Sequence, residues 1–261
     1  MADDRKTGQH YDKVAFTSGP KIYSSASLYD DMYTLGEFAP PGPFEVLDAM
    51  CGAGLVGKEM GKRLDAAGIA YTLHFVDLAE KKIGALKQEG HDARVASVLE
   101  LPYNSGGLDR VYARFGVKNY PRGSQLEIFR KFRDVLRAPG IFVLTDMEAP
   151  EEAYDFMQLE RRTKNRFTGL EGNEPHMPTL QDWYAMLNEC GLAHRQTKHH
   201  VSYVTTSDWV KSNQMTPEGL AEMNVFLLDA PESARRALNI RQEGSDVKIN
   251  YSVVVISAGI Q

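Results

Sequence analysis

Short apolar runs alternate with helix-like segments over residues 44–145, and this alternation constrains the fold more than any other feature of the sequence. Residues 44–49 have the length and composition of a buried strand. Glycines follow, and then Val56, Met60 and Leu64 recur at the spacing of one helix face. Further strands are expected at 71–76, 93–96, 108–113 and 141–145, with helices at 80–88 and 124–136 between them. Strands separated by helices of this size predict a mostly parallel sheet with helices on both faces.

The remaining chain is expected to add two closely paired strands, at 193–205 and 247–256, with short helices between them. Before them, Thr179 and Asp182 have the spacing of a capping box, which predicts that a helix begins there. We therefore predict an α/β fold built on a seven-stranded, mostly parallel sheet whose last strand is antiparallel. Such sheets bind ligands at the carboxyl ends of their strands.

The domain boundaries follow from breaks in this pattern. Residues 1–43 are polar and aromatic and end in a proline-rich turn, so they are expected to form an N-terminal arm. Its tyrosines, at positions 11, 23, 29 and 33, either close over a ligand as a lid or simply pack on the sheet. Residues 44–261 form the main domain, and the polar stretch at about 148–178 is expected to be a cap insert.

Composition excludes several classes of function. The net charge of 30 − 35 = −5 argues against a non-specific binder of nucleic acid. No apolar run approaches the roughly 20 residues that a membrane helix needs, and the first residues lack the apolar core of a signal peptide. Cys51 and Cys190 are the two cysteines, which favours a reducing compartment. We expect a cytoplasmic protein with neither a nucleic-acid partner nor a membrane span.

The segment VLDAMCGAG, residues 46–54, carries the sharpest chemical signal. A strand ends in Asp48, and a loop with Gly52 and Gly54 then turns into a helix. The two glycines let the backbone approach a ligand closely, and the loop amides attract an anionic group such as a carboxylate or phosphate. Asp77 ends the next expected strand, where a carboxylate can accept hydrogen bonds from both hydroxyls of a ribose. Together these features predict a bound nucleoside with a charged tail.

Two cofactors fit this loop. Gly52, Gly54 and Gly57 satisfy G-x-G-x-x-G, the dinucleotide fingerprint, which indicates an NAD(P)-dependent oxidoreductase as one alternative. Asp48 would repel the pyrophosphate of a dinucleotide, however, and it tolerates an ammonium group well. Electrostatics therefore favour S-adenosyl-L-methionine, whose methionine end carries an ammonium, over NAD.

The same segment resembles the first motif of the class I S-adenosylmethionine-dependent methyltransferases. Later segments resemble further motifs of this family in its usual order: HFVDL, RVASVLELPY, LDRVYARFGVKNY and FRDVLRAPGIFVLTDMEAP. The sequence FGVKN at residues 115–119 is especially similar to the C-methyltransferases of ubiquinone and menaquinone biosynthesis. The resemblance implies a Rossmann-like fold and methyl transfer from S-adenosylmethionine.

The resemblance also implies roles for single residues in cofactor binding. It gives the methionine end to Asp48, Gly52, Ala53, Gly54 and Arg114, the ribose to Asp77, and the adenine to Leu78, Ser97 and Val98. It assigns no catalytic residue and no metal ligand.

Three positions depart from the family pattern. Met50 stands where a glycine is common, and Ser97 replaces an acid that would accept a hydrogen bond from the adenine amine. Arg114 replaces a small polar residue and puts a cation near the reaction centre. It is expected either to bind an anionic substrate or to pair with Asp146 or Glu148.

Other candidate groups have simpler explanations. Cys51 is expected to be a packing residue, and His176 is the histidine most worth testing. Of His199 and His200, at most one can face a site, because consecutive side chains of a strand point in opposite directions. The basic run at 161–166 is interpreted as a solvated helix face, with anion or RNA binding as the alternative.

We therefore predict a methyltransferase that uses S-adenosylmethionine and acts on a small-molecule acceptor, with an aromatic or quinone-like ring as a candidate. Two alternatives stay open. One is the NAD(P)-dependent oxidoreductase, and the other is a protein that binds S-adenosylmethionine without catalysis. The oligomeric state is also open, with a homodimer as one alternative.

Overall fold

A single sheet organises the molecule in the computed structural model, which describes residues 4–14, 25–39, 42–168, 170, 174–212 and 214–260. The strand order is β3-β2-β1-β4-β5-β8-β6, and β7 pairs with β8. The strands are β1 Phe44–Ala49, β2 Tyr71–Asp77, β3 Asp92–Val95, β4 Leu108–Arg114, β5 Leu136–Glu148, β6 Leu192–Thr205, β7 Arg241–Glu243 and β8 Asp246–Ile260. The last strand, β8, runs antiparallel to both β5 and β6. The predicted fold class is confirmed, with β7 as an eighth strand too short for alternation in the sequence to indicate.

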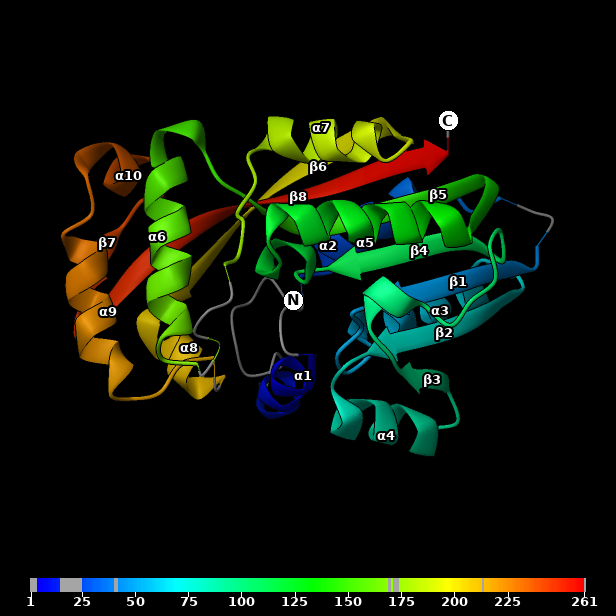
Figure 1. Ribbon diagram of the computed structural model, residues 1–261, viewed down its shortest axis with the longest axis horizontal. Helices are drawn as coiled ribbons and strands as arrows, with labels where there is room; N and C mark the ends of the chain where they lie inside the picture. Colours follow the sequence, from blue (N-terminus) through cyan, green and yellow to red (C-terminus); the bar gives the residue numbers. More distant parts are fainter. Residues whose placement is uncertain are drawn as a thin grey trace.

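Helices cover both faces of this sheet (Figure 1). They are α1 Asp4–Lys13, α2 Ala26–Leu35, α3 Leu55–Ala66, α4 Glu80–Gln88, α5 Arg122–Val135, α6 Tyr154–Asn165, α7 Leu180–Glu189, α8 Thr206–Lys211, α9 Gly219–Leu228 and α10 Glu232–Ala237. Short 3-10 turns lie at η2 Val98–Glu100, η3 Val117–Asn119 and η4 Glu151–Ala153. In Figure 1, α5 and α7 lie in front of the sheet, and α2 and α3 lie behind it.

Strand β1 shows how the sequence builds these two layers. Successive side chains of a strand face opposite sides of the sheet. Val46 accordingly packs in the core with α2, α3, α6 and α9, whereas Leu47 and Ala49 pack in the core with α5 and α7. The strand is buried on both faces, as expected of a central parallel strand. Its acidic residue, Asp48, therefore ends up buried at the carboxyl edge of the sheet.

The predicted helix start at Thr179 is confirmed. The Thr179 hydroxyl accepts a hydrogen bond from the Asp182 amide at 3.1 Å, and the Asp182 carboxylate accepts one from the Thr179 amide at 3.0 Å. Trp183 follows in the first turn, fully buried, and its indole Nε1 donates to the Met147 carbonyl at 3.1 Å. This bond fixes α7 on the end of β5.

Strand β5 begins at Leu136, earlier than the strand expected at 141–145. Its register pairs Leu108 with Leu136 and then Arg110 with Ile141, so residues 137–140 form an irregularity within the strand. Residues 137–140 therefore form a bulge within the strand and do not precede it. The physical reason is that Leu136 is buried and still pairs with β4, which extends the strand back to the end of α5.

The N-terminal arm divides into two helices with different surroundings. Helix α2 is part of the core, and its Tyr29 is buried there while Tyr33 packs against the same cluster. Helix α1 lies against α4 (Figure 1), where the Asp12 carboxylate accepts a hydrogen bond from the Lys81 amide at 2.9 Å. Tyr23 lies outside the described residues.

None of the described helices combines the length and the apolar character that crossing a bilayer requires.

Close packing between α3 and β2 generates a stability prediction. A Cβ added at Gly57 would overlap the Phe75 ring and come within 2.8 Å of its Cζ, and this ring is fully buried. We expect Gly57→Ala to lower the free energy of unfolding by about 1–3 kcal/mol, the usual range for an overpacked core. Gly84 in α4 is the matched control, since a Cβ there meets nothing within 4 Å. Gly84→Ala should stabilise by about 0.5–1 kcal/mol. Urea denaturation measures both, and equal effects of the two substitutions would contradict the packing argument.

Candidate functional site

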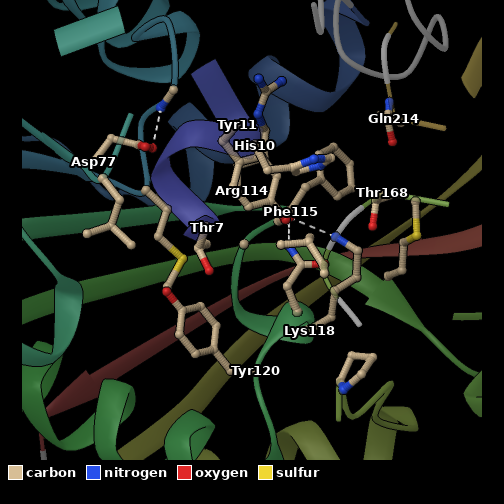
Figure 2. A pocket seen from close by; sticks show the side chains of 18 of the residues that line it. Thr7, His10, Tyr11, Asp77, Arg114, Phe115, Lys118, Tyr120, Thr168 and Gln214 are labelled. Atoms are coloured by element: carbon tan, nitrogen blue, oxygen red, sulfur yellow. Dashed lines mark hydrogen bonds between the residues drawn. The ribbon is translucent and has the colours of Figure 1, made fainter. Parts of the chain in front are cut away.

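The carboxyl ends of the parallel strands open into a large cavity. Asp48 comes from the end of β1, Asp77 from β2, Arg114 from β4 and Met147 from β5, and all four line it. Strand β1 lies between β2 and β4, so the connections from its two sides diverge and leave a crevice above it. Figure 2 shows this cavity with Asp77 at one side and with Thr168 and Gln214 at the other.

The glycine loop forms one wall of the cavity. Gly52 and Gly54 adopt positive φ values of 53° and 72°, a left-handed conformation that glycine reaches without penalty. The Gly52 amide donates a hydrogen bond to Asp77 Oδ2 at 2.7 Å, and the Ala79 amide donates to Asp77 Oδ1 at 2.8 Å. Asp77 therefore links the loop to the end of β2. Burial of the carboxyl group raises the pKa of Asp77, and these backbone hydrogen bonds oppose the shift.

Asp48 binds the backbone of α3, just beyond the glycine loop. Its residue is 1% exposed, and its Oδ2 accepts a hydrogen bond from the Gly57 amide at 2.8 Å. Burial raises the pKa of Asp48 to about 7, while the hydrogen bond and the charge of Arg114 oppose this shift. Asp48 and Asp77 thus place two carboxyl groups at the glycine loop, and the nearby cations that act on them are Arg114 for Asp48 and Lys82 for Asp77.

Two residues of the cavity wall carry backbone strain. Met50 and Phe115 both have φ of 55°, which is unfavourable for residues with a Cβ. A Cβ on Gly116 would overlap the Met50 sulfur, so the two segments are packed tightly together. The conformation at Met50 is one that glycine adopts freely, which gives a physical reason for the glycine usual in the resembling family.

Arg114 extends from the end of β4 into the middle of the cavity (Figure 2). Its Nη1 donates a hydrogen bond to the Tyr29 hydroxyl at 3.0 Å, and the guanidinium lies 5.5 Å from the centre of the Tyr29 ring. Of the acids expected as partners, Asp146 forms an ion pair with Lys118, and Glu148 accepts a hydrogen bond from the Ser252 hydroxyl at 2.5 Å. Arg114 is thus positioned by an aromatic side chain of α2.

The FGVKN segment forms η3 and the floor of the cavity. Lys118 Nζ lies 2.9 Å from Asp146 Oδ1 and donates to the Phe115 carbonyl at 2.8 Å. The Asn119 amide group donates to the same carbonyl at 3.2 Å. Burial lowers the pKa of Lys118 to about 8, an effect that the Asp146 carboxylate partly offsets. The basic residue of this segment therefore has a structural partner within the fold.

The far wall of the cavity comes from the insert at 148–178 and from the C-terminal part of the chain. Helix α6 turns a polar face inward, and strand β8 and the segment around α8 complete the wall. The inward residues are Glu160, Arg161, Lys164, Asn165, Trp209, Gln214 and Tyr251. The interpretation of 161–166 as a solvated face is wrong for this side of the helix, because the cavity provides a polar environment inside the molecule. Lys164 is only 4% exposed.

Most residues predicted to bind the cofactor lie together on the wall formed by the glycine loop and the neighbouring strand ends, which we call the near wall. The lining includes Asp48, Gly52, Ala53, Asp77, Leu78, Val98 and Arg114. Gly54 and Ser97 are not part of it: Gly54 precedes the first turn of α3, and the Ser97 hydroxyl accepts a weak hydrogen bond from the Leu99 amide at 3.4 Å. Ala96 reaches the wall beside Ser97.

The sequence reasoning missed the contribution of α1. Thr7, His10 and Tyr11 line the cavity from this helix (Figure 2). Their spacing puts them on one helix face, so a helical pattern in the arm could have indicated them. Burial and the charges of Lys164 and Arg161 lower the pKa of His10 to about 4, so its imidazole is neutral at pH 7.

His176 and His200 form hydrogen bonds within the fold, and Cys51 is buried. His176 Nδ1 lies 2.9 Å from Gln125 Oε1, and His200 Nε2 lies 2.9 Å from Asp31 Oδ2. Neither histidine lines the cavity. Burial and the charge of Asp48 raise the pKa of Cys51 well above its usual range, which keeps the thiol protonated and unreactive.

Comparison with known proteins agrees with this geometry. Residues 46–140, from β1 to the start of β5, match a family described as a methyltransferase domain. No curated protein gives a significant sequence match. Among solved structures, a candidate methyltransferase from Bacillus halodurans C-125 has a TM-score of 0.74 at 19% identity, covering 90% of this chain and 99% of that one. The YcgJ protein from Bacillus subtilis has a TM-score of 0.74 at 17% identity, with 91% and 99% covered.

A third similar structure is geranyl diphosphate C-methyltransferase from Streptomyces coelicolor A3(2), which contains Mg²⁺, geranyl diphosphate and S-adenosyl-L-homocysteine. Its TM-score is 0.55 at 14% identity, with 90% of this chain and 80% of that one covered. At these identities the likeness concerns the fold. The matched domain, together with this fold, defines the class: the protein is a methyltransferase that depends on S-adenosylmethionine. The residues that match the methyltransferase domain include the ends of β1 and β2, which carry Asp48 and Asp77 beside the glycine loop.

The buried pair between Lys118 and Asp146 generates a second prediction. Removing one partner of such a pair leaves an uncompensated buried charge. We expect Lys118→Met to lower the free energy of unfolding by about 3 kcal/mol. Adding Asp146→Asn to this variant removes the unpaired charge and should recover part of the loss. Urea denaturation at neutral pH measures both variants, and a Lys118→Met protein as stable as the wild type would show that the pair contributes nothing.

Proposed function

We propose that the near wall of the cavity binds S-adenosylmethionine and that the far wall binds a small-molecule methyl acceptor. The observation that carries this assignment is the pair of carboxyl groups at the glycine loop, where Asp77 accepts from the Gly52 amide and Asp48 accepts from the Gly57 amide. Two acids at this loop favour a ligand with a cationic end and disfavour a pyrophosphate. The same argument makes the NAD(P)-dependent oxidoreductase the weaker alternative.

The residues present fit this cofactor. The Asp77 carboxylate, already oriented by two backbone amides, has lone pairs left to accept ribose hydroxyls. Asp48 provides negative charge for the ammonium end, and the apolar side chains of Leu78 and Val98 suit an adenine ring. Thr7 Oγ1 is buried and has no hydrogen-bond partner among the described residues, which is consistent with a polar ligand that would contact it. Gly54 and Ser97 would act indirectly, by shaping the two loops.

The chain's own part in methyl transfer is alignment and exclusion of water. S-adenosylmethionine supplies an activated methyl group when it is bound, so the protein must hold the acceptor in line with that group. Helix α1 is suited to close the cavity, because its Gly8 packs directly against the Leu78 carbonyl. We therefore propose that α1, within the arm of residues 1–43, acts as a lid, and that residues at about 148–178 act as the cap over the acceptor.

A small acceptor with a ring fits the aromatic residues of the floor and the far wall. The aromatic side chains of Phe115, Tyr120, Trp209 and Tyr251 line the cavity, and such surfaces bind flat rings. The similarity of FGVKN to quinone C-methyltransferases supports a quinone-like acceptor. The geranyl diphosphate C-methyltransferase of similar fold, whose structure holds a small organic molecule, supports a small acceptor more generally.

The assembly and compartment form a further part of the proposal. We propose a homodimer, because β8 is the one strand that pairs with β6 among the described residues, and β6 carries Val201 at 71% exposure. A cytoplasmic location is supported by the two cysteines, Cys51 and Cys190, which are both free.

The titration of Asp48 generates a third prediction. Its carboxyl group has a raised pKa of about 7, so it is partly protonated near neutrality. A cationic ligand binds the ionised form, and binding should therefore weaken as the pH falls below about 7, by up to about tenfold per pH unit. Asp48→Asn keeps an acceptor for the Gly57 amide but carries no charge. It should bind S-adenosylhomocysteine weakly and with a flatter pH profile.

Isothermal titration calorimetry with S-adenosylhomocysteine between about pH 5.5 and about pH 8.5 measures this dependence. Asp134→Asn is the matched control, because Asp134 lies on α5 with about half of its side chain exposed. It should reproduce the wild-type profile. Wild-type affinity that does not vary over this range would contradict the role of Asp48, and absence of any binding would overturn the proposed function.

The packing of α1 generates a fourth prediction. A Cβ at position 8 would overlap the Leu78 carbonyl oxygen, so Gly8→Val should displace α1 from the cavity. We expect the affinity for S-adenosylhomocysteine to fall several-fold while the unfolding transition stays near that of the wild type, since α1 lies outside the buried core of the sheet. The matched variant is Gln9→Val on the exposed side of the same helix. If both variants bind like the wild type, α1 is not a lid.

A further inference from the structure

The far wall of the cavity has more positive than negative charge. Arg161 and Lys164 enter it from α6, whereas the charge of Arg114, which reaches the middle of the cavity from β4, acts on Asp48. Lys118 is also in the lining, but Asp146 balances its charge at 2.9 Å. The acid that α6 contributes to this wall is Glu160, which accepts a hydrogen bond from the Tyr251 hydroxyl at 3.2 Å. An excess of cations therefore remains on the side of the cavity opposite Asp48 and Asp77.

The contacts of Lys164 and Arg161 do not neutralise them. Lys164 Nζ lies 3.3 Å from Gln214 Oε1 and 4.3 Å from the centre of the Trp209 ring, and both partners are uncharged. The Arg161 guanidinium donates to Asn119 Oδ1, which is also neutral. Within the described part of the chain, no carboxylate comes within ion-pair distance of either side chain. Buried cations are rarely left without a counter-charge.

The proximity of these cations contributes to lowered pKa values of Lys164 itself and of His10. Burial and the charge of Arg161 lower the pKa of Lys164, although Glu160 opposes the shift. Burial together with the charges of Lys164 and Arg161 also lowers the pKa of His10, which lines the cavity from α1. Burial is the largest cause of both shifts, and the contributions of the α6 cations to them indicate a positive potential within the cavity, which an anion bound there would relieve.

We propose that the methyl acceptor carries an anionic group, a carboxylate or a phosphate, and that Arg161 and Lys164 bind it. This inference rests on the proposed function and specifies its substrate class. Gln214 and Asn165, which line the same wall, offer amide N–H groups for further hydrogen bonds. The apolar part of the acceptor then lies against Phe115, Met147 and Met177, towards the wall that holds the cofactor. The end of the cavity at Asp48 and Asp77 thus favours a cationic group, and the end at α6 favours an anionic group.

Carboxylate and phosphate share the chemistry that these cations recognise, so the test includes both. The protein, saturated with S-adenosylhomocysteine, is titrated by calorimetry with benzoate, phenyl phosphate and the neutral analogue benzamide. We expect at least one anion to bind roughly tenfold or more tightly than benzamide. Preference for benzoate identifies a carboxylate acceptor, and preference for phenyl phosphate identifies a phosphate acceptor. Equal binding of benzamide and of both anions, or no binding of either anion, would overturn the proposal.

Variants on one helix locate the site. Lys164→Met and Arg161→Met should each weaken binding of the preferred anion by about tenfold, with little change in affinity for S-adenosylhomocysteine. Arg166→Met is the matched control, because Arg166 ends the same helix and faces outward to Glu222 at 2.9 Å. It should leave anion binding unchanged. Wild-type anion binding in both inner variants would refute the site. If the wild-type protein does not bind S-adenosylhomocysteine, the proposed function is refuted instead.

Discussion

The hydrogen bond between the Gly57 amide and the Asp48 carboxylate is the contact on which the site depends. It joins the end of β1 to the first turns of α3 across the glycine loop, and it forms only because Gly57 lets the helix approach Phe75 and Asp48 without an intervening side chain. The loop amides are therefore fixed where Asp77 can accept from Gly52. A small, buried, polar contact thus determines the shape of the near wall.

The cavity that results is polarised along its length. The acids stand at the ends of β1 and β2 because those strands stop at the same edge of a parallel sheet, whereas the cations come from α6, a helix added after β5. Arg114 lies between the two groups and is held by Tyr29 of α2. Opposite potentials in one cavity orient a cationic cofactor and an anionic acceptor towards each other, which a uniformly charged cavity could not do.

The near wall could be predicted from the sequence because its determinants are local. Asp48, Gly52 and Asp77 lie next to strand ends that periodicity locates, and the topology of parallel strands brings those ends together. The far wall could not be predicted in this way. Whether Lys164 faces solvent or the cavity depends on how α6 docks on β8 and α8, and those contacts join residues distant in sequence. The short strand β7 was missed for the same reason, since it exists through its pairing with β8.

In the fingerprint G-x-G-x-x-G, different glycines are required for different structural reasons. Gly57 is required by packing against Phe75, and Gly54 by the left-handed turn into α3, so both would be needed whichever nucleotide is bound. Ligand choice lies instead with the charges beside the loop. Asp48 is buried and its charge acts on that of Asp77, so a pyrophosphate placed on this loop would meet two carboxylates. The glycines explain the shape of the site, and the acids explain why a sulfonium cofactor suits it.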